Sequence, residues 1–234
     1  MKKRLIALAT LVAVSAPLHA GMEDDPLLVK LMIDQFEQRS GDDEDPVVLE
    51  ADAWLGKDLH KLWIKTDVER VDGETEQAEV QLRYSRAVAP YWDFQIGARS
   101  DLEPSDEKRN WLALGFRGLA PYFFDIDAAL YIGEEGRTQL SFDTEYEVMF
   151  TQKLVLSPEL QVVVNGKKDD ALGQGAGLSS VEAGLRLRYE IVREFAPYVG
   201  INWEGVFGDT ADYVEAAGGE TSDTQFVVGI RAWY

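Results

Sequence analysis

The sequence has 234 residues, and its 42 aspartates and glutamates against 23 lysines and arginines give a formal net charge of −19. A chain this acidic is repelled by nucleic-acid phosphates, so the composition argues against nucleic-acid binding. The absence of cysteine excludes disulfides, thiolate metal sites and thiol catalysis, and the length suits one domain.

The first twenty residues predict a secretory signal peptide. A basic start at 2–4 (K-K-R) precedes an apolar run at 5–17, and residues 18–20 (L-H-A) form a cleavage site that ends on a small residue. The alternative is a retained membrane helix, but the apolar run is too short to cross a bilayer. We therefore expect an exported chain that begins near residue 21 and carries a charge of about −22.

Residues 21–52 are expected to form an acidic periplasmic N-terminal segment. Acidic clusters at 23–25 and 42–45 flank a piece from 27 to 36 whose apolar residues recur at helical spacing. A solvated tail is the plain interpretation, and capture of metal cations by the carboxylates is the alternative. Residues 47–55 are expected to add a short extended piece that leads into the next domain.

From Leu59 onward, apolar side chains occupy every second position. This period of two places apolar groups on one face of a strand and polar or charged groups on the other. Together with the C-terminal strand, the pattern predicts ten strands, and twelve is the alternative. The first nine alternating stretches lie at 61–69, 78–85, 92–99, 111–117, 122–132, 140–149, 159–165, 181–190 and 199–204.

The last stretch, 224–234, alternates in the same way and ends on Tyr234. It resembles the closing strand of bacterial outer-membrane barrels, in which a terminal aromatic residue is part of the assembly signal. Three A-P-Y segments, at 89–91, 120–122 and 196–198, and one S-P-E segment at 157–159 are predicted as short turns, because proline cannot donate to a strand ladder. The opposite connections are polar and mostly longer, as is typical of an outer-membrane barrel: 71–75, 102–108, 133–136, 166–177 and 208–223.

These patterns predict an all-β fold, a closed antiparallel transmembrane barrel over residues 53–234. No apolar run after the signal is long enough for a membrane helix, and a closed barrel is then the architecture that satisfies its backbone groups in lipid. The alternative is a soluble lipocalin-like barrel with its apolar face inward. The many charges on the other face favour the arrangement with apolar groups outward and charges inward.

Residues 56–66 (G-K-D-L-H-K-L-W-I-K-T), the A-P-Y segments and the last strand resemble the outer-membrane copper resistance protein B family, over about residues 47–234. The resemblance implies a small barrel in the bacterial outer membrane, in contact with its lipid, that moves or sequesters copper ions within a periplasmic copper-tolerance system. A periplasmic copper protein is then a candidate partner. Members commonly carry a Met- and His-rich N-terminal region, whereas here that region offers only Met22 and Met32.

Copper is the one cofactor-like ion that the resemblance implies, and the candidate ligands are few. Thioethers suit Cu(I) and imidazole suits Cu(II). Each candidate also has a structural interpretation, as part of a solvated tail, an interfacial histidine or a methionine that fills a gap. The predicted metal-site residues are Met22, Met32, His60, Glu145, Glu147 and Met149.

The remaining lumen charges should mostly pair with one another, and their acidic excess should favour cations. We therefore expect charge-selective passage or weak relay of copper ions without chemistry on the ion. We expect no enzyme and no catalytic cofactor, since after signal removal His60 is the one histidine available as a general base and no G-x-S-x-G or phosphate-binding motif occurs. The alternative function is a structural or adhesive barrel without a metal role.

Overall fold

A computed structural model describes residues 25–41, 45–102 and 108–234. The predicted signal peptide and the candidate ligand Met22 lie outside these ranges. Across the described ranges, none of the helices has the length and apolar character needed to cross a bilayer.

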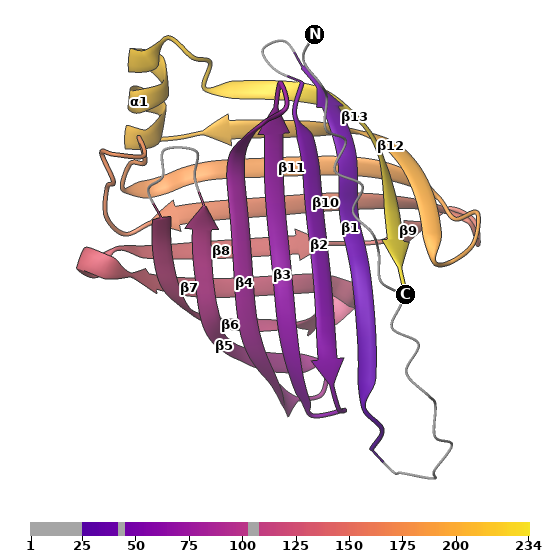
Figure 1. Ribbon diagram of the computed structural model, residues 1–234. Helices are drawn as coiled ribbons and strands as arrows, with labels where there is room; N and C mark the ends of the chain where they lie inside the picture. Colours follow the sequence, from indigo (N-terminus) through magenta and orange to yellow (C-terminus); the bar gives the residue numbers. More distant parts are fainter. Residues whose placement is uncertain (1–24, 42–44, 103–107) are drawn as a thin grey trace, which may run out of the picture.

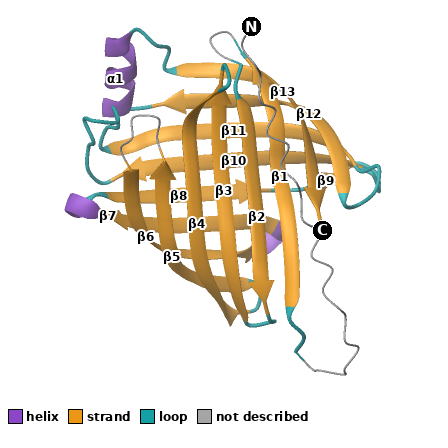
Figure 2. Ribbon diagram, viewed as in Figure 1, coloured by secondary structure: helices purple, strands orange, loops and turns teal. Residues whose placement is uncertain are grey.

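In the described residues, twelve long antiparallel strands form a closed barrel (Figures 1 and 2). Each pairs with the next along the chain, β8 pairs with β10, and β13 pairs with β1 to close the ring. A two-residue strand, β9 (Val148–Met149), adds to the edge of β10. The long strands are β1 Leu28–Ser40, β2 Val47–Gly56, β3 His60–Val71, β4 Glu74–Ala89, β5 Trp92–Leu102, β6 Lys108–Ala120, β7 Phe124–Gly133, β8 Thr138–Glu145, β10 Leu154–Asn165, β11 Gly177–Tyr189, β12 Phe195–Val206 and β13 Ser222–Trp233.

The closing ladder joins β1 to β13. Met32 of β1 lies opposite Trp233 of β13, and the backbone of Leu31 exchanges two hydrogen bonds with that of Tyr234, at 2.9 and 2.8 Å. The last residue is therefore part of the wall.

The prediction of an all-β closed barrel is confirmed, but the count of ten strands is wrong and the alternative of twelve is correct. The two missed strands, β1 and β2, lie mostly within 21–52, so the barrel begins at Leu28 instead of residue 53. A β-bulge between Ile33 and Gln35 explains the error for β1. In β1, even-numbered side chains face the lumen up to Asp34, and odd-numbered side chains face it from Gln35 onward. Because of this switch, the apolar residues of the segment recur at the spacing expected of a helix.

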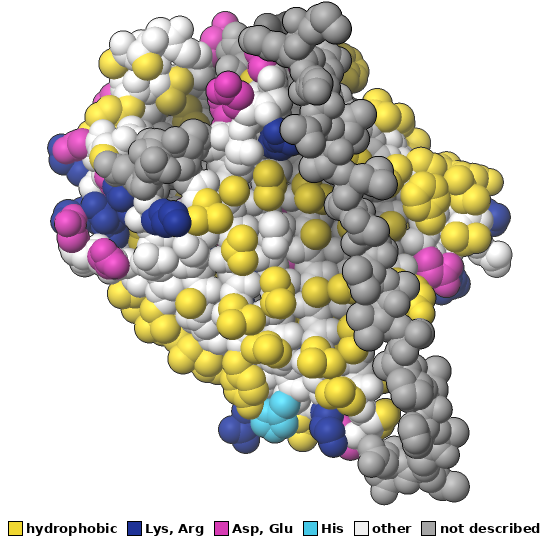
Figure 3. All heavy atoms as spheres, viewed as in Figure 1, with side chains coloured by type: hydrophobic (Ala, Val, Ile, Leu, Met, Phe, Trp, Pro, Cys, Tyr) yellow, Lys and Arg dark blue, Asp and Glu magenta, His cyan; other side chains and the backbone are white. Residues whose placement is uncertain are grey.

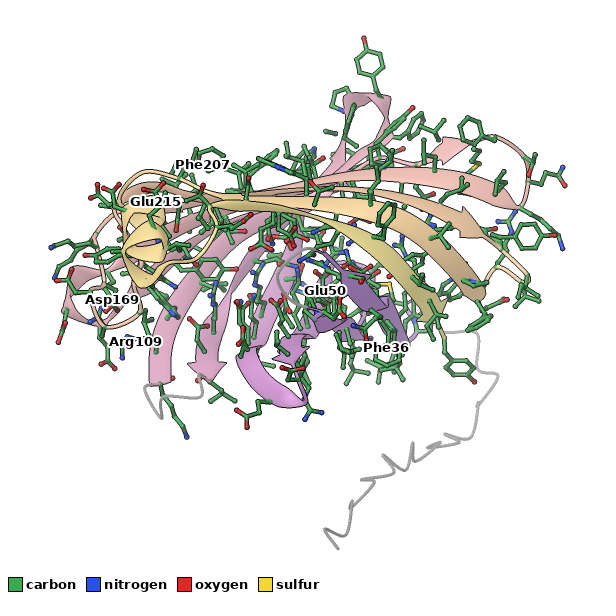
Figure 4. All side chains as sticks on the ribbon, turned by 90° about the horizontal axis from the view of Figure 1, so that it is seen from above. Phe36, Glu50, Arg109, Asp169, Phe207 and Glu215 are labelled. Atoms are coloured by element: carbon green, nitrogen blue, oxygen red, sulfur yellow. The ribbon has the colours of Figure 1, made fainter. Side chains whose placement is uncertain are left out.

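The wall has its apolar face outward. Leu82 and Phe226 are 49% and 75% exposed, whereas Gln95 and Arg186 are 0% and 2% exposed. Figure 3 shows apolar side chains spread over the outer surface of the strands in that view. The soluble alternative with a dry apolar centre is therefore excluded. Seen from above in Figure 4, strands β1–β5 and β10–β12 form two facing walls.

The ends of the barrel differ. Residues 57–59, 90–91, 121–123, 146–153 and 190–194 connect strands at the short-turn end. The long-loop end carries the described connections 166–176 and 207–221, the latter with helix α1 (Asp209–Ala217), and also the tight Asp72-Gly73 turn and the 3-10 turn Glu134–Gly136. The A-P-Y turns at 89–91 and 120–122 are found as expected, the latter as a 3-10 turn at Pro121–Phe123.

The other two proline segments are not turns, because Pro158 lies in β10 and Pro197 lies in β12. Pro197 precedes the first residue of β12 that pairs with β11, and Pro158 faces the gap between β8 and β9. A missing donor N–H therefore costs little at either position.

Candidate functional site

The lumen is the candidate functional site. It is a cavity of about 710 Å³ to which all twelve long strands contribute side chains, most of them polar or charged. It follows from the alternation of the strands, which sends every second side chain inward.

One cluster of charges lines the wall formed by β3–β7. Asp127 accepts hydrogen bonds from Lys65 and from Arg83 Nη1, the latter at 3.1 Å. Arg83 also donates to the Tyr131 hydroxyl at 2.6 Å, and the guanidinium of Arg99 lies 4.6 Å from the Tyr131 ring centre. Arg83 and Arg99 thus each have both a carboxylate and an aromatic neighbour, and Lys65 has the carboxylate of Asp127; these contacts compensate the loss of water around the cations.

A second cluster lies on the side formed by β1 and β10–β12. Arg186 donates to Glu37 at 2.8 and 2.9 Å and to Glu159 at 2.6 Å. Glu37, which is 2% exposed, also accepts from the Tyr198 hydroxyl at 2.8 Å. Gly229 makes this packing possible, since a Cβ atom there would lie 2.6 Å from the Tyr198 ring and 2.7 Å from Glu37 Cβ.

A third cluster lies at the short-turn end. Arg231 contacts Asp34 at 3.2 Å and Glu145 at 2.9 Å, and Arg188 contacts Glu145 at 3.1 Å as well as Glu147. Carboxylates from β1 and from the β8–β9 segment are thereby linked to β11 and β13 across the mouth of the lumen.

Cations and carboxylates in the lumen are not balanced. Lys30 lies over the ring of Trp233. The other lumen-facing cations along the strands have a carboxylate within 4.0 Å: Arg39, Lys61, Lys65, Arg83, Arg99, Arg109, Arg117, Arg186, Arg188 and Arg231. Within the described ranges, five carboxylates that line the cavity have no such ion pair: Glu50, Asp67, Asp125, Asp143 and Glu204.

The strand register places several carboxylates directly opposite one another. A row crosses four strands from Glu50 of β2 through Asp67 of β3 and Glu79 of β4 to Asp101 of β5. Arg99 contacts both Glu79 and Asp101, so the β4–β5 half of the row is compensated. The β2–β3 half is not, and like charges in opposed positions repel one another.

The structure separates the predicted metal ligands. Glu145 and Glu147 lie together in the short-turn cluster, and Met32 lines the same end of the cavity from β1 instead of belonging to a tail. Met149 is 71% exposed at the rim. His60 lies on the outer face, where its Nδ1 is 2.5 Å from the Tyr84 hydroxyl.

Among the residues that the structure describes, no three or more histidine, aspartate and glutamate side chains converge closely enough to bind a metal ion directly. Four lumen residues were not predicted as such, because β1 and β2 were not predicted as parts of the barrel: Glu37, Arg39, Glu50 and Asp52. For β2, the alternation of Glu50 and Asp52 with Leu49 and Ala51 could have revealed them.

The long-loop end is covered by two segments that pack on each other. Asp169 of loop 166–176 contacts Arg109 at 3.2 Å and Arg137 at 2.9 Å. Thr210 of α1 accepts from the backbone of Gly175 at 2.9 Å, so the loop and the helix are joined near Asp169 and Arg109 in Figure 4. Loop 166–176 is therefore held by ion pairs to Arg109 of β6 and to Arg137, which precedes β8, and by the hydrogen bond to α1.

The outer surface of this covering carries an exposed ionic contact. The Tyr213 hydroxyl of α1 donates to Asp170, and the Lys168 ammonium lies 3.2 Å from the same carboxylate. Hydrogen bonds from these two groups lower the pKa of Asp170 below its usual range. The contact therefore survives moderate acidification, although its exposure limits what it contributes.

Comparisons with known proteins agree with this geometry. The family model described as "Copper resistance protein B precursor (CopB)" matches residues 27–234. Copper resistance protein B of Escherichia coli is 38% identical over 216 residues, which are 92% of this chain and 72% of the relative. A copper resistance protein B homolog of Pseudomonas syringae pv. tomato (strain ATCC BAA-871 / DC3000) is 36% identical over 218 residues, 92% of this chain and 74% of the relative.

Solved porin structures share the fold. The NanC porin aligns with a TM-score of 0.58 and 10% identity, covering 86% of this chain and 98% of the porin. The KdgM porin aligns with a TM-score of 0.53 and 13% identity, covering 87% and 98%. At such low identity these likenesses concern the architecture of the barrel alone.

Proposed function

Because the chain belongs to the copper resistance protein B family, we propose that its barrel passes copper ions across the outer membrane through the acidic lumen. The family and the barrel fold give a role in copper tolerance and a place in the outer membrane. Movement of the ion through the lumen is the proposed step.

The two ends of the barrel give this path an orientation. Outer-membrane barrels place their short turns in the periplasm and their long loops outside the cell. The cluster of Arg188, Glu145 and Glu147 then lies at the periplasmic mouth, and Asp169 with its two arginines lies at the outer mouth.

The observation that carries the proposal is the excess of unpaired carboxylates. Lumen cations are occupied by ion pairs, so few positive charges remain to attract anions. Glu50, Asp67 and Glu204 lack an ion pair within the described ranges. In a narrow interior with a low-dielectric wall, such carboxylates raise the local concentration of cations and repel anions.

The predicted soft ligands fit the periplasmic mouth better than the centre of the lumen. Met149 is exposed at the rim and follows Glu145 and Glu147 at the same strand parity, and Met32 lines the cavity nearby. We assign these four residues to weak contacts with copper as it passes, since thioethers favour Cu(I). His60 stays a separate candidate on the outer face, where Tyr84 occupies Nδ1 and leaves Nε2 for a metal.

Copper flux into proteoliposomes tests the proposal. Vesicles that enclose a copper-sensitive dye should respond faster with the barrel than without it. The triple variant Glu50→Gln, Asp67→Asn, Glu204→Gln should slow the response, because it removes three lumen charges. Glu135→Gln, an exposed charge beyond the strands, is the control and should behave as the unchanged protein. A dye response equal to that of protein-free vesicles would refute copper passage.

A structural barrel without a metal role is the second candidate. The observation that favours it is the network of ion pairs inside the lumen, in which Arg186 alone contacts Glu37 of β1 and Glu159 of β10. If this candidate is correct, the protein will show the heat-modifiable gel migration of a folded barrel but neither copper flux nor copper binding.

A further inference from the structure

We infer that loop 166–176 is a strap across the outer mouth of the lumen, and that the ion pairs of Asp169 with Arg109 and Arg137 form a latch that holds the strap in place and limits the entry of ions. This deepens the proposed function, because it rests on ion passage through the lumen and names how that passage is regulated.

The strap has a fixed shape of its own. The backbones of Asp169 and Gln174 exchange two hydrogen bonds, at 2.8 and 3.0 Å, and so form the base of a small hairpin. The N–H of Leu172 also donates to the carbonyl of Asp169 at 3.2 Å, and Gly173 supplies the positive φ of 63° in the turn. A loop with these internal bonds is held or released as one unit.

The latch fixes one side of the strap to the wall. One carboxylate oxygen of Asp169 accepts from the N–H of Ala171 at 3.2 Å, and the other contacts Arg109 Nε at 3.2 Å and Arg137 Nε at 2.9 Å. Asp169 is 7% exposed, so water competes little with these charged bonds. Arg109 belongs to β6 and Arg137 precedes β8, whereas the strap leaves the barrel from β10. The latch therefore links the strap to a strand on the far side of β7.

The other side of the strap is joined to α1. The N–H of Gly175 donates to Thr210 Oγ1 at 2.9 Å, and the same hydroxyl lies 3.0 Å from Ser179 Oγ of β11. A Cβ atom on Gly175 would lie 2.3 Å from the backbone nitrogen of Thr210, so this close approach requires glycine. Because α1 lies in the connection from β12 to β13, the strap is attached to the barrel on both of its sides.

Between these two attachments the strap reaches the lumen. Gln174 lines the cavity, together with Asn165 and Ser179 from the strands on either side of the strap. Figure 4 shows Asp169 and Arg109 near each other at the end of the barrel that carries α1. A segment that is attached at two points and lines the cavity between them narrows the path of an ion that enters from outside.

The next residue along the strap offers a matched control. Asp170 carries the same charge as Asp169, but its partners Tyr213 and Lys168 lie on the outer surface. The side chain of Asp170 is 66% exposed, against 8% for that of Asp169. A comparison of the two aspartates therefore separates the latch from a general effect of charge in the loop.

Conductance of the intact chain in planar bilayers in potassium chloride tests the latch. Asp169→Asn and Arg137→Gln each remove part of it, and each should raise the conductance at least about twofold. The two substitutions change the charge of the mouth in opposite directions, so an increase in both comes from opening and not from charge. Gly175→Val, which keeps the charge, should raise the conductance as well. Asp170→Asn should change it by less than about a fifth.

Limited digestion with trypsin gives a second measurement, because Lys167 and Lys168 lie in the strap. A protease cuts a segment at a rate that follows how often the segment opens. Asp169→Asn and Arg137→Gln should therefore be cut in the strap at least about threefold faster than the unchanged protein. Heat-modifiable migration shows that each variant is a folded barrel.

Regulation by the latch is excluded if Asp169→Asn and Arg137→Gln both leave the conductance unchanged, if they change it in opposite directions, or if neither speeds the tryptic cut. These measurements contain no copper, so their failure would leave copper passage standing. Conversely, an absence of copper flux in proteoliposomes would leave the latch standing where the potassium conductance responds as expected.

Discussion

Asp127 and Asp67 are both lumen-facing aspartates near the middle of a strand, yet their surroundings are opposite. Asp127 lies within 4.0 Å of three cations, Lys65, Arg83 and Arg117. Asp67 lies opposite Glu50 on one side and Glu79 on the other, and has no ion pair in the part of the chain that the structure describes. The comparison teaches that cations from the neighbouring strand and from strands farther around the ring, and not burial alone, decide whether a lumen carboxylate holds the wall together or stays unpaired.

The largest effect is expected where the paired type of carboxylate loses its cation. Arg186→Met leaves Glu159 without an ion pair and leaves the buried Glu37 with Arg39 as its remaining cation, so unfolding should become easier by about 3 kcal/mol. Urea titration of the barrel in lipid vesicles measures the change.

The matched control is the double variant Arg186→Met, Glu37→Gln, which removes the charge of Glu37 together with its partner and should recover part of the lost stability. If the double variant is no more stable than Arg186→Met, the charge of Glu37 is not the cause.

A smaller loss of stability is expected when Asp127, the carboxylate that several cations share, is neutralised. Asp127→Asn should destabilise the barrel by about 2 kcal/mol, since Arg83 keeps Tyr131 and Arg117 keeps Asp52 as partners. The same change frees positive charge and should lower the preference of the lumen for cations over anions. Reversal potentials across planar bilayers in a salt gradient measure this preference, and an unchanged potential would contradict the prediction.

Neutralising an unpaired carboxylate should increase the stability of the barrel instead of lowering it. Glu50→Gln removes the repulsion with Asp67 and should stabilise the barrel by about 0.2–1 kcal/mol, measured by the same urea titration. A destabilised Glu50→Gln would show that Glu50 has a structural role and would remove the distinction between the two types.

The smallest effect should come from a charge outside the lumen. Glu135, with 69% of its side chain exposed, forms a surface contact with Arg137 at 2.9 Å. Glu135→Gln should change the free energy of unfolding by less than about 0.5 kcal/mol and leave cation preference unchanged. A larger shift in either measurement would mean that the loop end influences the lumen.

The sequence predicts the wall far better than it predicts the pairing inside it. Alternation alone gives the orientation of residues such as Leu82 and Arg186, because a strand leaves only two faces to choose from. It fails at β1, where the bulge switches the inward parity, and at Pro158 and Pro197, where a missing donor is tolerated in a strand.

The partners of charged side chains in the lumen could not be predicted from the sequence. Gln35 donates to Glu159 at a separation of 124 residues, and Arg186 reaches Glu37 at a separation of 149. Such contacts depend on the closure and the flattening of the ring, which no local pattern contains. The acidic excess could be counted from the chain, but which carboxylates stay unpaired could not.

The bonds between Leu31 and Tyr234 have a consequence for biogenesis. They join positions more than two hundred residues apart, and such distant pairings are the slowest to form. Until the C-terminal strand arrives, β1 presents an open row of backbone donors and acceptors, which is a hazard for aggregation. A chain without β13 would leave this row of β1 unpaired and could not close its own wall.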